Sequence, residues 1–182
     1  MYPTMEFESF VWDEDGCAAE RTISGESFQR LIELCFAQAD AFSMNSAPWT
    51  HATDRRLARA LEPYRIRSFE TGSWFCYAST YPPLRVNLYR AAEGAKAAIL
   101  RYIGHLFLYG DKNAEFCSLE DLCFFRDGEL FFGTVTHERI CFAHILSDEF
   151  GTALGELGPW TNAADGSFTH IFLSQFSSNP TL

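Results

Sequence analysis

The chain contains little lysine and no long apolar run. Of its 14 basic residues only Lys96 and Lys112 are lysine, and the formal net charge is −10. Nucleic acids and anionic membranes attract clustered basic residues, so this charge balance argues against both as partners. The longest apolar stretches, 97–109 and 123–132, contain charged residues. They fall short of the roughly 18 apolar residues that a membrane-spanning helix needs.

The sequence motifs of common enzyme classes are missing too. The chain contains no G-x-S-x-G, H-E-x-x-H, G-x-x-x-x-G-K-[ST] or G-x-G-x-x-G segment, and these motifs mark hydrolase, zinc, phosphate and dinucleotide sites. The N-terminus lacks the basic segment followed by an apolar one that characterises a secretory signal. We therefore expect a cytoplasmic protein without a cofactor, and a binding protein rather than an enzyme.

Disulfide bonds are not expected, although the number of cysteines is even. Without a secretory signal, a chain of 182 residues does not depend on disulfides for stability. Most of the cysteines have apolar neighbours, as Cys35 has between Leu34 and Phe36, and free cysteine packs as a small apolar residue in such surroundings. We expect reduced thiols at positions 17, 35, 76, 117, 123 and 141.

The overall composition predicts one folded domain covering residues 1–182. Hydrophobic residues make up 47% of the chain and charged residues 21%, which excludes disorder driven by charge. The chain carries 18 Phe, 7 Tyr and 4 Trp. So many rings are hard to bury in one small domain, so some are expected at a binding surface.

Periodicity of the apolar residues predicts several helices and strands. Between residues 25 and 42 they recur every three or four positions, which indicates one apolar helical stripe. Shorter helices are predicted through Leu57 and Leu61 up to Pro63, over 91–103, and after a capping Ser147. Strands are predicted at 6–12, 64–70, 74–78, 84–89, 105–109 and 168–173.

The most specific fold signal lies in residues 119–146. Asp127-Gly128 separates two strand-like runs, and this dipeptide favours a type I′ hairpin turn because both of its residues tolerate positive φ. A second reversal at His137-Glu138 leads into a third strand. The sequence thus predicts a three-strand C-terminal meander in an α+β fold, with a mostly antiparallel sheet and helices packed on one face.

Charge is distributed unevenly along the chain. Residues 51–110 carry a net charge of +5, whereas residues 1–50 carry −7 and residues 111–182 carry −8. Arginines of the central segment either pair with the acidic flanks or line a pocket for an anion. Arginine together with aromatic rings is typical of binding sites. The residues proposed for such a pocket are Arg65, Arg67, Arg85, Trp74 and Tyr77.

His137 and Glu138 are weak candidates for catalysis. An imidazole beside a carboxylate can act as a general base, but adjacent turn residues usually point apart into solvent. No metal site is expected, because Cys141 and His144 lie three residues apart on a predicted strand and so face opposite sides.

Acidic loops favour a protein-binding function. Clustered carboxylates attract a basic partner by electrostatic steering. In size and charge the chain is similar to bacterial immunity proteins, which neutralise toxins, but no specific residue carries this analogy. We expect a non-enzymatic binding protein with a basic protein partner, and leave a homo-oligomer open. The loop residues expected to contact the partner are Asp13, Glu14, Asp15, Asp127, Glu129, Asp148 and Glu149.

The alternative is a domain that binds, or acts on, an anionic small molecule through the arginine and aromatic residues together with His137. The two hypotheses differ in geometry. A deep concave pocket that holds two or more of the side chains Arg65, Arg67, Arg85, Tyr77 and His137 favours the small-molecule hypothesis. A convex face with clustered acids and an exposed aromatic ring favours the protein-binding hypothesis.

Overall fold

An eight-stranded antiparallel sheet organises the protein. The computed structural model describes residues 2–12, 14–48, 52–78, 82–107, 117–164 and 171–176, with only the backbone of Tyr77 and Phe176. The strand order is β12-β1-β11-β10-β9-β4-β8-β5, and every neighbouring pair is antiparallel. The strands are β1 (Thr4–Phe7), β4 (Ala41–Ser46), β5 (Arg65–Thr71), β8 (Leu84–Arg90), β9 (Leu119–Arg126), β10 (Glu129–Val135), β11 (Ile140–His144) and β12 (Trp160–Asn162).

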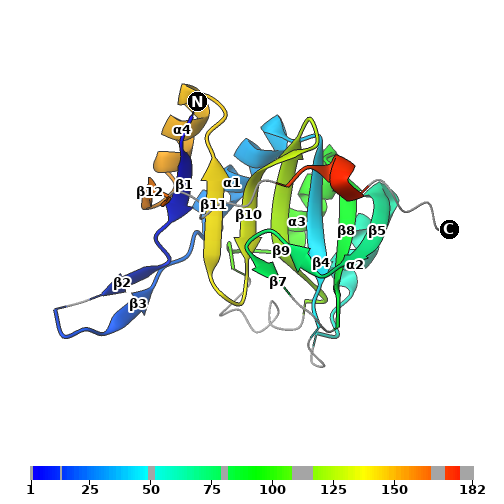
Figure 1. Cartoon of the computed structure of the whole chain (residues 1–182), viewed down its shortest axis with the longest axis horizontal. Coiled ribbons are helices and arrows are strands. Elements are labelled where there is room, and N and C mark those ends of the chain that lie inside the picture. Colours follow the sequence, from blue (N-terminus) through cyan, green and yellow to red (C-terminus); the bar gives the residue numbers. More distant parts are fainter. Residues whose placement is uncertain are drawn as a thin grey trace.

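Helices cover one face of this sheet (Figure 1). Apolar side chains of all four α-helices join one core cluster with Phe42, Tyr89 and Phe124 of the sheet. A second cluster on the opposite face contains Trp74, Phe75 and Ile171. The predicted α+β class with helices on one side is confirmed. The helices are α1 (Gly25–Gln38), α2 (Arg56–Leu61), α3 (Glu93–Tyr102) and α4 (Asp148–Gly155), with short 3₁₀ turns η1 (Glu62–Tyr64) and η2 (Leu173–Phe176).

The C-terminal meander is confirmed in detail. Strands β9, β10 and β11 pair in sequence order. Asp127 and Gly128 have φ of 52° and 77°, as the type I′ turn requires. Ser147 caps α4, because its hydroxyl accepts a hydrogen bond from the N–H of Phe150 at 3.2 Å.

The predicted helix over 25–42 is too long. Helix α1 ends at Gln38, and residues 41–46 form β4, an interior strand between β8 and β9. The apolar spacing that links Cys35, Phe36 and Ala39 continues to Phe42, so the periodicity alone does not show where the helix ends. Pairing on both sides satisfies the backbone groups of β4, and this long-range gain overrides local helical spacing.

Four other predicted strands differ from the structure. Residues 6–12 are divided between β1 and the two-stranded pair β2 (Phe10–Trp12) and β3 (Ala18–Glu20). Residues 73–78 form a tight hairpin of β6 (Ser73–Trp74) and β7 (Tyr77–Ala78), with Phe75 at φ 51° in the turn. Of the predicted strand 105–109, His105 forms only an isolated bridge with Ser24, and residues 108–109 lie outside the described part. Of the predicted strand 168–173, residues 168–170 lie outside the described part, and Phe172 bridges to Glu129.

A bulge in β5 separates two arginines that sequence spacing would place together. Arg65 is paired with Tyr89, whereas Arg67 is paired with the preceding residue, Leu88, so Ile66 is the extra residue. Tyr89 and Leu88 face opposite sides of the sheet. Arg65 therefore lies on the helix-covered face and Arg67 on the other face.

The β2–β3 hairpin projects from the sheet at its β1 end (Figure 1). We call residues 10–20 the arm. Trp12 and Phe10 on the arm are 70% and 40% exposed. Arg139 anchors the arm, because its guanidinium pairs with Glu20 and lies 6.0 Å from the centre of the Phe10 ring.

All six cysteines are free, as predicted. Cys35, Cys123 and Cys141 are fully buried, and burial raises the pKa of each of these thiols. Cys17 is exposed on the arm. Among the described residues, no helix is both long and apolar enough to cross a membrane.

Gly133 is predicted to be required for packing against the β6–β7 hairpin. A Cβ at this position would lie 2.9 Å from the Phe75 ring, whereas one at Gly155 would meet no atom within 4 Å. We expect Gly133→Ala to lower the free energy of unfolding by about 1–3 kcal/mol, because the buried ring must shift. Gly155→Ala, the control, should be neutral or slightly stabilising. Urea unfolding of the two variants checks this, and equal midpoints would contradict it.

Candidate functional site

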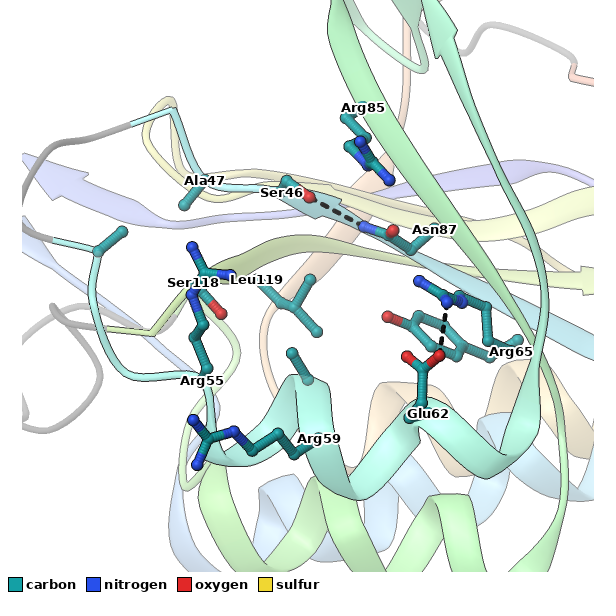
Figure 2. Close-up of a pocket in the computed structure, with 13 residues that line it drawn as sticks. Ser46, Ala47, Arg55, Arg59, Glu62, Arg65, Arg85, Asn87, Ser118 and Leu119 are labelled. Atoms are coloured by element: carbon teal, nitrogen blue, oxygen red, sulfur yellow. Dashed lines mark hydrogen bonds and ion pairs between the residues drawn. The ribbon is translucent and has the colours of Figure 1, made fainter.

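A cavity of about 740 Å³ opens between α2 and the sheet on the helix-covered face (Figure 2). We call it the arginine pocket. Helix α2 contributes one wall, and the ends of β4, β5, β8 and β9 contribute the other. Its lining residues are Ser46, Ala47, Ala52, Arg55, Ala58, Arg59, Glu62, Arg65, Arg85, Asn87, Tyr89, Ser118 and Leu119.

Four arginines from three parts of the chain meet in this pocket. Arg55 and Arg59 come from the start and the body of α2, Arg65 from β5, and Arg85 from β8. Arg85 shares the helix-covered face with Asn87 and Tyr89 because strand residues alternate between faces. Four arginines and one glutamate give the lining a formal charge of +3, in a chain whose net charge is −10.

Most of this positive charge has no acidic partner. The guanidinium of Arg65 pairs with Glu62 at 2.5 Å (Figure 2). Within the described ranges, Arg55, Arg59 and Arg85 form no salt bridge. The nearby Asp54 is engaged by Arg56 outside the pocket, and the hydrogen bonds from Arg56 lower the pKa of that carboxyl. Three guanidinium groups thus remain available to a bound anion.

Neutral polar groups of the pocket are fixed in position. The Asn87 amide donates to the Met44 carbonyl at 3.2 Å and to the Ser46 hydroxyl at 3.1 Å, and it accepts from Ser68 at 2.8 Å. Burial raises the pKa of the Tyr89 phenol to about 12. Tyr89 therefore stays protonated at neutral pH and retains its hydrogen-bond donor.

Only some of the predicted ligand-binding residues meet in the pocket. Arg65 and Arg85 line it. Trp74 is buried in the core of the other face, where its ring meets Phe69 edge-on. Arg67 lies on that face as well, above the Phe69 ring, and donates to the Leu173 carbonyl at 3.2 Å. The side chain of Tyr77 lies outside the described structure.

The weak catalytic candidates lie away from the pocket, in the turn after β10. His137 Nε2 is 3.7 Å from the carboxylate of Glu138, which is largely exposed. His137 also lies in a group with Glu120 and Asp121, whose ligand atoms are all within 4.8 Å of one another. Burial raises the pKa of Asp121, although hydrogen bonds from Thr136 and Asn45 oppose this change.

The predicted acidic loops lie at two ends of the sheet. Glu14 and Asp15 are exposed at the tip of the arm. Asp127, Glu129, Asp148 and Glu149 lie at the opposite end, next to the turn between β9 and β10 and the start of α4. Asp13 is outside the described residues. These carboxylates do not form one continuous patch.

Several residues of interest were not selected from the sequence. Arg55 and Arg59 carry no motif, and their role follows only from the packing of α2 beside β8. Glu120 and Asp121 do leave a signal, since two consecutive acids interrupt the otherwise apolar strand that begins at Leu119.

Comparisons with protein-family models, curated proteins and solved structures found no match. The function therefore has to be argued from the residues themselves.

The pKa of Tyr89 tests whether its phenol is buried where it lines the pocket. Its phenol should titrate near pH 12, about two units above an ordinary tyrosine, and the absorbance difference at 295 nm between wild type and Tyr89→Phe isolates this group. Because the pKa is raised on folding, this residue's contribution to stability is kept below pH 10 and lost as the pH rises towards 12. A difference curve centred near pH 10 would show that the phenol is not buried.

Proposed function

We propose that this protein binds a small polyanionic ligand in the arginine pocket. The supporting observation is the lining charge of +3 in a strongly acidic chain, with three guanidinium groups that no described carboxylate neutralises. Like charges are brought together in a folded protein at a cost, which a bound anion offsets. The presence of Arg65 and Arg85 in one pocket supports the small-molecule hypothesis, because both belong to the residues expected to converge around an anion.

Arginine is suited to this role because its planar group donates paired hydrogen bonds to phosphate or carboxylate oxygens. The positive pocket also attracts anions, which the remaining acidic surface repels. A volume of about 740 Å³ is in the range that accommodates a drug-sized molecule. We therefore favour a ligand with at least two negative charges and with a further oxygen that accepts a hydrogen bond from the Tyr89 phenol.

We propose binding rather than catalysis. The described lining includes no histidine, cysteine or lysine, and its only carboxylate, Glu62, is ion-paired with Arg65. Ser46, Ser118 and Tyr89 also line the pocket. A serine needs a neighbouring base to act as a nucleophile, and Tyr89 keeps its proton because burial raises its pKa to about 12. A cytoplasmic location remains part of this proposal, and the six free thiols support it.

Binding of inorganic pyrophosphate, followed by calorimetry and thermal unfolding, tests the proposal. We expect the wild type to bind this probe and to unfold at a higher temperature in its presence. Arg85→Gln and Arg59→Gln should each weaken binding roughly tenfold, because each removes a charged hydrogen-bond donor. Binding should also weaken as salt is added.

Arg90→Gln is the matched control for these variants. Arg90 lies on β8, the strand of Arg85, and is exposed outside the pocket lining. Its replacement should leave pyrophosphate affinity unchanged. If the wild type binds neither pyrophosphate nor citrate, or if Arg90→Gln weakens binding as much as Arg85→Gln does, the pocket is not the binding site.

A second candidate function is the capture of a basic protein, as an immunity-type protein would do. The observation in its favour is the arm, where Trp12 is 70% exposed beside the acidic residues Glu14 and Asp15. An exposed tryptophan with neighbouring carboxylates is suited to a basic partner, because the ring supplies buried area and the charges supply steering.

This candidate predicts that the arm recovers a basic protein from a lysate of the native host. We expect Trp12→Ala to reduce recovery at least tenfold, while Tyr2→Ala, which changes an exposed ring outside the arm, has no effect. Recovery should fall at high salt. If both variants recover the same proteins as the wild type does, the arm is not the contact surface.

A further inference from the structure

Four polar side chains meet on the sheet face opposite the arginine pocket. Glu120 and Asp121 stand at the start of β9, Asn45 near the end of β4, and His137 in the turn after β10. Asn45 is paired with Val86, which belongs to the core of this face, and with Glu120 on its other side. We call Asn45, Glu120, Asp121 and His137 the carboxylate cluster.

Hydrogen bonds from neighbouring strands orient the Asp121 carboxylate. Its Oδ1 accepts from the N–H of Thr136 at 2.7 Å, and its Oδ2 accepts from the Asn45 amide at 3.0 Å. The Thr136 hydroxyl in turn accepts from the N–H of Asp121 at 3.1 Å. Each carboxylate oxygen keeps a further lone pair for another contact, because an ionised carboxylate has about four acceptor sites.

Asn45 supplies an independent sign that a ligand belongs here. Its side chain is 1% exposed, and its Oδ1 has no hydrogen-bond partner within the described part of the chain. The Nδ2 of the same amide group donates to Asp121, so the Asn45 side chain adjoins the carboxylates. Buried amide oxygens are almost always satisfied, and a cation satisfies an oxygen that has no donor near it.

The burial of two adjacent carboxylates also favours a bound cation. Glu120 and Asp121 are 6% and 1% exposed. Two negative charges held together out of water repel each other and lose hydration, and a dication compensates both effects at once. The ligand atoms of Glu120, Asp121 and His137 lie within 4.8 Å of one another. Atoms bound to one ion at about 2.0–2.2 Å are separated by up to roughly 4.4 Å, so only a small contraction is needed.

The kinds of donor atom select the class of ion. The two carboxylates are hard donors, whereas the imidazole of His137 favours a transition metal over Mg²⁺ or Ca²⁺. The cluster contains no thiolate. His137 keeps 24% of its side chain exposed, so one side of the site is open to water.

We propose that the carboxylate cluster binds one Mn²⁺ or Zn²⁺ ion, with Glu120, Asp121 and His137 as its protein ligands and with the Asn45 side chain beside them. The sequence alone predicted no metal site, because it directed attention to Cys141 and His144. The cluster lies across the sheet from the arginine pocket, so this proposal does not depend on the proposed anion binding.

Metal titration of the full-length chain, stripped with a chelator and kept reduced, tests this proposal. Binding of Mn²⁺ is followed by loss of the electron paramagnetic resonance signal of the free ion, and binding of Zn²⁺ by calorimetry. Mn²⁺ avoids confusion with thiol sites, because it prefers oxygen and nitrogen donors. We expect one ion per chain and a higher unfolding temperature when the ion is present.

Three variants locate the ion. Asp121→Asn removes a charge but suits the backbone, since asparagine tolerates the φ of 56° at this position. His137→Gln removes the imidazole in a turn. Each should weaken binding at least tenfold, whereas His144→Gln, which changes a histidine on β11 that contacts Thr4, should not.

The outcomes are decisive in each case. A wild type that binds neither ion at millimolar concentration overturns the proposal, and so does full affinity in both cluster variants. If Asp121→Asn does not fold, His137→Gln decides, because His137 is half-buried in a turn and its replacement leaves the Asp121 hydrogen bonds intact. Pyrophosphate binding should be the same in His137→Gln as in the wild type.

Discussion

Pairing of β4 on both of its sides is the constraint on which the rest of the structure depends. This strand joins the C-terminal meander, through β9, to the β8–β5 pair. Side chains along it alternate between faces, so two successive residues serve different sites. Ser46 lines the arginine pocket, and Asn45 reaches Asp121 on the opposite face. A shift of register by one residue would exchange these side chains and disrupt both sites.

The parts of the fold that could be predicted from sequence are those fixed by local chemistry. The Asp127-Gly128 turn needs two residues that accept positive φ. Ser147 acts as a cap through a hydrogen bond to Phe150, which is only three residues away in the sequence. Strand β4 could not be recognised, because Phe42 continues the helical spacing of α1 and the partners that make 41–46 a strand come from distant parts of the chain. Local patterns carry no information about such pairing.

The same distinction applies to the candidate sites. Arg65 and Arg85 could be selected because arginines are concentrated in the central segment. Arg67 could not be separated from Arg65, because residues two apart share a face in a regular strand and the bulge at Ile66 breaks that rule. The carboxylate cluster depends on the approach of three strands and a turn. Two consecutive acids in an apolar strand were its only trace in the sequence.

The bulge in β5 has a further effect at the margin of the sheet. Among the described strands β5 is the last on its side, so one row of its backbone N–H and C=O groups is not paired with another described strand. A regular row of this kind invites another chain to add a strand and can seed aggregation. The extra residue makes the row irregular, and the charges of Arg65, Arg67 and Glu70 oppose close stacking. The bulge that places Arg65 and Arg67 on opposite faces therefore also opposes the addition of a strand from another chain at this edge.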